Sequence, residues 1–161
     1  MHTEPLHLLI IPAKQRILAA NPKPTILMPA MNDQRHPDIE IYVKNRSLTA
    51  IENWLVSLGE SFSPSTSQDS DKSSHQYSLI IAGNTIPVFI HERAAGKAWT
   101  SVWFQSGQTP WIKDLDCARI AAAALETQVR CIATGWQNGD DPDEWWKVED
   151  QTEVLIQWTS A

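Results

Sequence analysis

The chain has 161 residues, of which 42% are hydrophobic and 20% are charged, and its formal net charge is −6. This length suits one domain, and the composition is that of a globular protein rather than a disordered one. A net negative charge repels the phosphates of nucleic acids and anionic membrane surfaces, so we expect the chain to bind neither. No apolar run approaches the roughly 20 residues of a membrane span.

Prolines at positions 5, 12, 22, 24 and 29 interrupt the beginning of the chain. Because proline removes a backbone donor and restricts the residue before it, residues 1–30 are predicted to form an N-terminal arm or extension. The alternative is an ordered arm that lies on the domain through its apolar residues. Residues 31–161 are predicted to form a single α+β domain.

The first regular elements are a strand over 39–43, where IEIYV alternates, and a helix over 48–59. In the helix, apolar residues recur at spacings of three and four, and Gly59 is the candidate C-cap. Residues 61–74 are rich in serine and lack periodicity. We expect them to form a mobile loop, because they cannot bury enough apolar surface to offset their ordering entropy.

A β-hairpin is predicted over 76–92, with its turn at Gly83-Asn84. Pro87 lies within the second strand, where it cannot donate to the sheet, and this favours a longer loop or an irregular register over a strict two-residue turn. The third strand, over 98–107, is predicted to place Trp99, Ser101, Trp103 and Gln105 on one face and Thr100, Val102 and Phe104 on the other.

The last elements are a helix of about twelve residues capped by Asp114 or Asp116, a strand over 129–136, and a hairpin of 145–148 with 153–158. The order β-α-β-β-β-α-β-β, with two or three strands after the second helix, lacks regular β-α alternation. It predicts an α+β fold with two layers, in which both helices pack on one face of a mostly antiparallel sheet. A homodimer joined through the other face is one way to cover that face.

The stretch GDDPDEWWKVED, residues 139–150, combines six acidic residues with two adjacent tryptophans. One interpretation is a solvated loop between strands, followed by one tryptophan that faces the core and one that faces outward. The functional interpretation is an aromatic anchor with an acidic rim, which would attract a basic partner. The predicted binding residues are Asp140, Asp141, Asp143, Glu144, Trp145, Trp146, Trp99 and Trp103.

The acidic stretch does not have the oxygen spacing of a calcium loop, and the five histidines are scattered along the chain. We therefore expect neither a metal nor a cofactor. The two cysteines, Cys117 and Cys131, lack the spacing of a redox motif, and we expect reduced thiols in a cytoplasmic protein.

Two residues are weak candidates for catalysis. His91 ends a strand next to aromatic residues, but Glu92 beside it faces the other way and cannot orient it. Cys117 lies in the first turn of a predicted helix, where the helix dipole lowers a thiol pKa, but Asp114 and Asp116 act in the opposite direction. Both residues are explained as well by structural roles, a strand-end histidine and a small buried side chain.

The favoured function is that of a small acidic, non-catalytic binding protein with a basic protein partner. An inhibitor or immunity-type partner of a basic toxin or nuclease is one form of this function. The first alternative is a small-molecule or peptide binder with a pocket formed by Trp99, Trp103, Trp136 and Phe89. A hydrolase-type enzyme that uses His91 or Cys117 and a purely structural or oligomeric role are the others.

Overall fold

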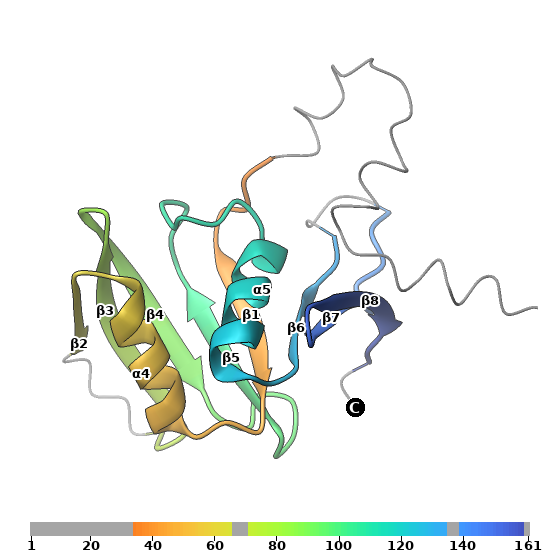
Figure 1. Ribbon diagram of the computed structural model, residues 1–161, viewed down its shortest axis with the longest axis horizontal. Helices are drawn as coiled ribbons and strands as arrows, with labels where there is room; N and C mark the ends of the chain where they lie inside the picture. Colours follow the sequence, from red (N-terminus) through yellow and green to blue (C-terminus); the bar gives the residue numbers. More distant parts are fainter. Residues whose placement is uncertain (1–33, 66–70, 135–138, 160–161) are drawn as a thin grey trace, which may run out of the picture.

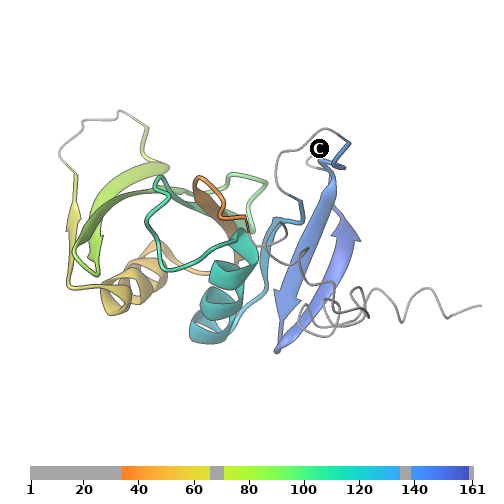
Figure 2. The same ribbon diagram turned by 90° about the horizontal axis from the view of Figure 1, so that it is seen from above.

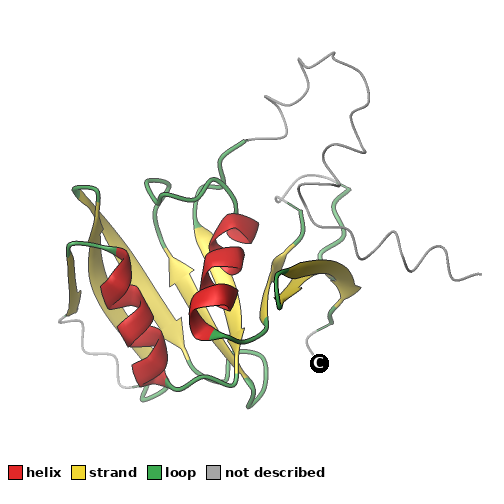
Figure 3. Ribbon diagram, viewed as in Figure 1, coloured by secondary structure: helices red, strands yellow, loops and turns green. Residues whose placement is uncertain are grey.

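The computed structural model describes residues 34–65, 71–134 and 139–159. Within these ranges the chain forms one eight-stranded antiparallel sheet and two helices (Figures 1 and 3). Both helices, α4 (Leu48–Leu58) and α5 (Asp114–Leu125), lie on the same side of the sheet (Figure 2). The predicted α+β class, two-layer architecture and element order are confirmed, with β2 as an additional strand between the helices and with three strands after α5. The predicted arm, residues 1–30, lies outside the described residues.

The strands follow the order β2-β3-β4-β5-β1-β6-β7-β8 across the sheet. Strand β1 therefore lies in the middle, with β5 on one side and β6 on the other, and the terminal hairpin forms one edge. The bounds are Ile39–Lys44 for β1, Ser61–Pro64 for β2, Ser74–Ile81 for β3, Asn84–His91 for β4, Trp99–Phe104 for β5, Val129–Ile132 for β6, Glu144–Glu149 for β7 and Thr152–Gln157 for β8.

Alternation along the strands separates the two faces of the sheet. In β1, the side chains of Ile39, Ile41 and Val43 are fully buried in the core beneath the helices. Glu40 and Tyr42 alternate with them and lie on the opposite face, which we call the open face. The core is therefore sandwiched between one sheet face and the two helices, and the open face is where polar and aromatic side chains collect.

Helix α4 begins at Ser47, whose Oγ accepts a hydrogen bond from the backbone N–H of Ala50 at 3.1 Å. This bond satisfies one of the backbone donors that a helix leaves unpaired at its start. Its buried residues are Ile51, Trp54 and Leu55, as the apolar spacing predicts. The helix ends at Gly59, where a Cβ atom would lie 2.1 Å from the carbonyl oxygen of Ile80 in β3.

The prediction of a loop over all of residues 61–74 is wrong at both ends. Residues Ser61–Pro64 form the edge strand β2, and Ser74 begins β3. Strand β2 pairs with β3 through backbone hydrogen bonds, which do not require an apolar side-chain pattern in β2. Its Phe62 ring also stacks on Tyr77, with ring centroids 4.7 Å apart. Residues 66–70, in the middle of the predicted loop, lie outside the described part of the chain.

The hairpin of β3 and β4 is confirmed, but its turn lies one residue earlier than the predicted Gly83-Asn84, because Asn84 already pairs with Ile81, and the expected effect of Pro87 is wrong. Its turn is the two-residue Ala82-Gly83, and both residues have a positive φ, as a type I′ turn requires. Pro87 opposes Ser78 of β3. In a hairpin with a two-residue turn this pair is a non-hydrogen-bonded one, so Ser78 does not require a backbone N–H from residue 87. On the side of β5, the carbonyl oxygen of Pro87 accepts a hydrogen bond from the backbone N–H of Gln105 at 2.9 Å, and the pairing of β4 with β5 ends there.

The predicted C-terminal hairpin is also confirmed as β7 and β8, joined by Asp150-Gln151, which both have a positive φ. Trp146 faces the helices and is part of the core, with 8% of its surface exposed. The guanidinium of Arg119 in α5 donates to both carboxylate oxygens of Glu153 in β8, at 2.5 and 3.1 Å. This ion pair joins the helical layer to the edge of the sheet.

Candidate functional site

Four aromatic side chains meet on the open face and form what we call the aromatic cluster: Tyr42, Trp99, Trp145 and Trp158. Trp158, which follows β8, contacts the other three, with ring centroids 4.9 Å from Trp99 and Trp145 and 5.5 Å from Tyr42. Tyr42 also lies 5.4 Å from Trp145. Trp99 and Trp145 are among the binding residues predicted from the sequence, whereas Tyr42 and Trp158 are not, because their neighbours come from strands distant in the chain.

Arg130 of β6 lies within this cluster. Its guanidinium carbon is 4.5 Å from the ring centroid of Trp99 and 4.7 Å from that of Trp158, a cation–π arrangement on two indoles. Burial lowers the pKa of the Arg130 side chain from its usual value. Lys147 opposes Arg130 in the next strand, and Lys44 lies 5.9 Å from the Trp99 ring. Three cations therefore lie in or beside the aromatic cluster, and the charge of Glu149, on the same side of β7 as Lys147, acts on Arg130.

A concave region of about 620 Å³ lies beside the cluster, and we call it the hollow. Among the residues that line it are Glu40, Tyr42, Phe89, His91, Ser101 and Trp103. The rings of Phe89 and Trp103 are 5.2 Å apart, and Ser101 Oγ donates to Glu40 Oε1 at 2.7 Å. Burial, followed by the charge of Glu40 and a hydrogen bond to it, raises the pKa of Tyr42 to about 12. The tyrosine is therefore neutral at physiological pH.

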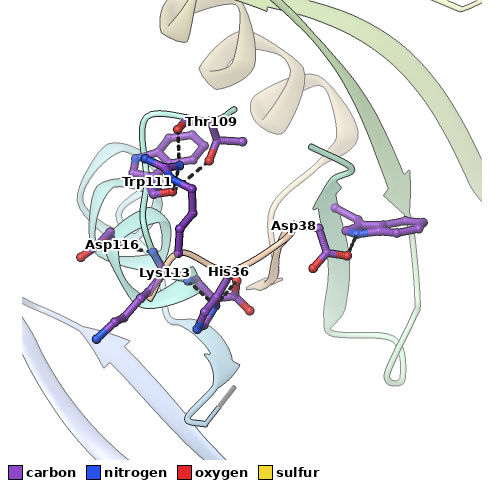
Figure 4. A network of polar contacts seen from close by, with 9 residues as sticks. His36, Asp38, Thr109, Trp111, Lys113 and Asp116 are labelled. Carbon is purple, nitrogen blue, oxygen red and sulfur yellow. Dashed lines mark hydrogen bonds and ion pairs between the residues drawn. The ribbon is translucent and has the colours of Figure 1, made fainter. Parts of the chain in front are cut away.

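Trp103 is held in place from the start of β1. Its indole Nε1 donates to Asp38 Oδ2 at 2.8 Å, and Figure 4 shows the Asp38 carboxylate directed at the bonded ring. The segment before Asp38 is itself fixed on the loop before α5. Arg35 donates to the carbonyl oxygens of Thr109 and Trp111 at 2.8 and 2.9 Å.

This network continues into the first turn of α5 (Figure 4). His36 Nδ1 lies 3.2 Å from Asp114 Oδ1, and the Asp116 carboxylate accepts from the backbone N–H of Lys113 at 3.2 Å. The prediction that Asp114 or Asp116 is the cap is therefore wrong: Lys113 occupies the N-cap position, and Asp116, three residues later, bonds back to its backbone N–H. Asp114 is buried, and burial raises the pKa of its carboxyl, an effect that His36 partly opposes.

The acidic turn, residues 139–144, is bonded directly to the aromatic cluster. Trp145 Nε1 donates to the carbonyl oxygen of Pro142 at 3.2 Å, and the backbone N–H of Trp158 donates to that of Asp143 at 2.8 Å. Asp141 Oδ1 accepts from the backbone N–H of Asp143 at 2.9 Å and so fixes the turn. The predicted proximity of acidic and aromatic residues is therefore present in the structure.

Not every predicted binding residue reaches this surface. Trp145 and Trp99 belong to the aromatic cluster, Trp103 lines the hollow, and Asp140, Asp141 and Asp143 lie in the acidic turn. Trp146 faces the core instead, and Glu144 begins β7 on the same side as Trp146, because alternate residues of a strand share a face. Trp136 lies outside the described residues.

The catalytic candidates do not assemble into a reactive group. His91 is exposed at the rim of the hollow, and its Nδ1 lies 2.6 Å from Ser74 Oγ, while Glu92 contacts His75 on the other face at 2.9 Å. Cys117 is fully buried, and burial, with a smaller effect of Asp114, raises its pKa well above the usual value. Cys117 is therefore a core residue and not an accessible thiolate. Cys117 and Cys131 are both free thiols.

In the part of the chain that the structure describes, no group of three or more His, Cys, Asp or Glu side chains could hold a metal ion. No helix in the same ranges is long and apolar enough to cross a membrane. Comparisons of the chain with protein-family models, with curated proteins and with solved structures found no match.

Proposed function

We propose that the chain is a small, non-catalytic binding protein that recognises a basic protein partner through the open face of its sheet. The observation that carries this proposal is the contact between the acidic turn and the aromatic cluster. Aromatic side chains are the most frequent energetic centres of protein interfaces, and carboxylates around them favour approach of a basic surface.

Carboxylates gather at one end of the open face. Asp38 and Glu40 lie near the start of β1. Strand pairing places Tyr42 level with Arg130 and Lys147, so the acidic turn, several residues before Lys147, lies at the same end as Glu40. Lys44 and Trp99 lie at the other end, where they pair. That end carries Glu149 beside its cations, so the end with Glu40 and the acidic turn is the one that would attract a basic partner.

The proposal can be tested without a known partner, by selection from a display library of random peptides on the full chain at low salt. We expect the selected peptides to be enriched in arginine and lysine together with an apolar residue. The variant Asp140→Asn/Asp143→Asn removes two charges from the acidic turn and keeps Asp141, which fixes the turn. It should weaken binding of the selected peptides about tenfold, and added salt should have the same effect on wild type.

The matched control is Glu126→Gln/Asp150→Asn, which removes the same net charge at two exposed positions away from the acidic turn. It should leave peptide binding within about twofold of wild type if the location of the charge matters rather than its total. Selection of peptides without a cationic bias, or equal weakening by both variants, would contradict the proposal. Concentration-dependent dimerisation through the open face would assign this face to a second copy of the chain.

The hollow supports a second candidate function, the binding of a small molecule. Its volume of about 620 Å³ falls in the range of known ligand sites, and Phe89 and Trp103 supply an apolar wall. An uncharged aromatic compound would then quench tryptophan fluorescence equally at low and high salt. Loss of that quenching in Trp103→Phe, with the fold retained, would favour this function over protein binding.

A further inference from the structure

We infer that the hollow is a subsite for an organic cation, the side chain of an arginine or lysine that a basic ligand inserts beside Glu40. This inference rests on the proposed function for its biological role, and its test is independent of the partner.

The first argument concerns the charge of Glu40. Its carboxylate lies on the open face, accepts the 2.7 Å hydrogen bond from Ser101, and lies close enough to the Tyr42 hydroxyl to raise its pKa. Hydroxyl donors of this kind hold a carboxylate in place, but they supply no positive charge. Within the described residues, no lysine, arginine or histidine forms an ion pair with Glu40. The carboxylate thus lacks a cation.

The second argument concerns the aromatic walls. Glu40 pairs with Trp103 across the sheet, and Trp103 pairs with Phe89. The two rings are tilted by 35°, and with Tyr42 they place three aromatic side chains in the lining of the hollow. A carboxylate surrounded by aromatic faces attracts guanidinium and ammonium groups, through its charge and through cation–π contact, and it repels anions.

The third argument concerns rigidity. Asp38 bonds the edge of the Trp103 indole, and the segment that carries Asp38 is bonded to the loop before α5. The indole is therefore oriented before a ligand arrives. Binding to side chains that are already ordered costs less conformational entropy, so even a single ligand side chain can bind measurably.

The test is a titration of the full chain at about pH 8, where an ordinary histidine is neutral. The probes are Nα-acetyl-arginine amide and Nα-acetyl-lysine amide, and the readout is the ¹H–¹⁵N signal of the Trp103 indole, assigned with Trp103→Phe. We expect saturable shifts with either cation. The neutral analogues, Nα-acetyl-citrulline amide and the Nε-acetylated lysine probe, should bind at least about tenfold more weakly, and this comparison needs no variant.

Variants then locate the site. Glu40→Gln should weaken the cationic probes about tenfold, and Phe89→Leu, which removes one π face, about two- to fivefold. Glu126→Gln is the matched control and should bind as wild type does. If Glu40→Gln does not fold, Phe89→Leu and the neutral probes still decide. Equal binding of charged and neutral probes, or no shift of the Trp103 signal at millimolar concentrations of probe, would overturn the inference.

The outcomes of the two tests are separable. Cation binding in the hollow without selection of basic peptides would retain the subsite and reject the protein partner. Selection of basic peptides that bind Glu40→Gln as tightly as wild type would retain the partner and reject the subsite.

Discussion

At the scale of single residues, Asp114 and Asp116 show how two similar side chains two positions apart acquire different roles. Both lie in the first turn of α5, and either is a suitable cap by residue type. In the structure Asp116 bonds the backbone N–H of Lys113, while Asp114 is buried next to His36. The first turn of a helix directs the two side chains to different sides, and only the packing of residues 35–38 shows which side is buried.

Asp114 leads to a pH-dependent prediction. Because burial raises the pKa of its carboxyl in the folded state, the folded protein binds more protons than the unfolded chain from about pH 4 up to that raised pKa. The contribution of this group to stability is therefore greatest at low pH and falls as the pH rises. Asp114→Asn should gain stability relative to wild type as the pH increases, which urea unfolding at a series of pH values will measure. A constant difference, or one of the opposite slope, would contradict this prediction.

At the scale of elements, backbone hydrogen bonding determines the place of two segments in the sheet that side-chain patterns do not predict. The serines of β2 carry no strand pattern, and Pro87 argues against a tight hairpin, yet both segments are in the sheet. In each case the hydrogen bonds join backbone groups. Which positions are hydrogen-bonded depends on the turn and on the register of the two strands, not on the side chains of one strand. The periodic elements, by contrast, were predicted well, because an apolar face repeats within one element.

Gly59 gives a prediction at this scale. Its φ of −140° is accessible to any residue, so its requirement is space: a Cβ atom there would overlap the Ile80 carbonyl oxygen, a backbone atom that cannot rotate away. Gly59→Ala should therefore destabilise the protein by more than about 2 kcal/mol. Gly83→Ala, at a positive φ but with open space, should cost only about 1 kcal/mol. Thermal or urea unfolding of both variants will rank them, and the reverse order would contradict this reason.

At the scale of the whole molecule, one side of the sheet forms the core and the other carries the proposed binding surface. The helices cover the face that carries the Ile, Val, Leu and Phe side chains of the strands, and the open face carries the aromatic cluster, the hollow and the charged residues around them. The Arg119–Glu153 ion pair ties α5 to the terminal hairpin that carries Trp145. Loss of this ion pair should therefore loosen the terminal hairpin, and with it the part of the open face that the hairpin carries, although the pair lies on the helical side of the sheet.

Arg119→Ala leaves the Glu153 carboxylate, whose side chain is 10% exposed, without its bidentate partner. We expect a loss of about 1–3 kcal/mol, moderated because Arg119 is itself partly exposed. Amide exchange should accelerate more in β7 and β8 than in β3 and β4. The double variant Arg119→Ala/Glu153→Gln should recover part of the loss, and strictly additive losses in the two single variants would show that the pair is not coupled.

The sequence by itself determined the α+β class, the two helices, most of the strands, and which residues of each strand share a face. These properties depend on apolar periodicity within one segment, which the order of residues states directly. Only the tertiary structure decided that Trp158 covers Tyr42, that Arg130 lies against Trp99, and that Glu40 lies beside Trp103 and Phe89. Those contacts depend on the register of strands that lie tens of residues apart in the chain. A sequence shows which residues are aromatic, but not which aromatic side chains will be in contact.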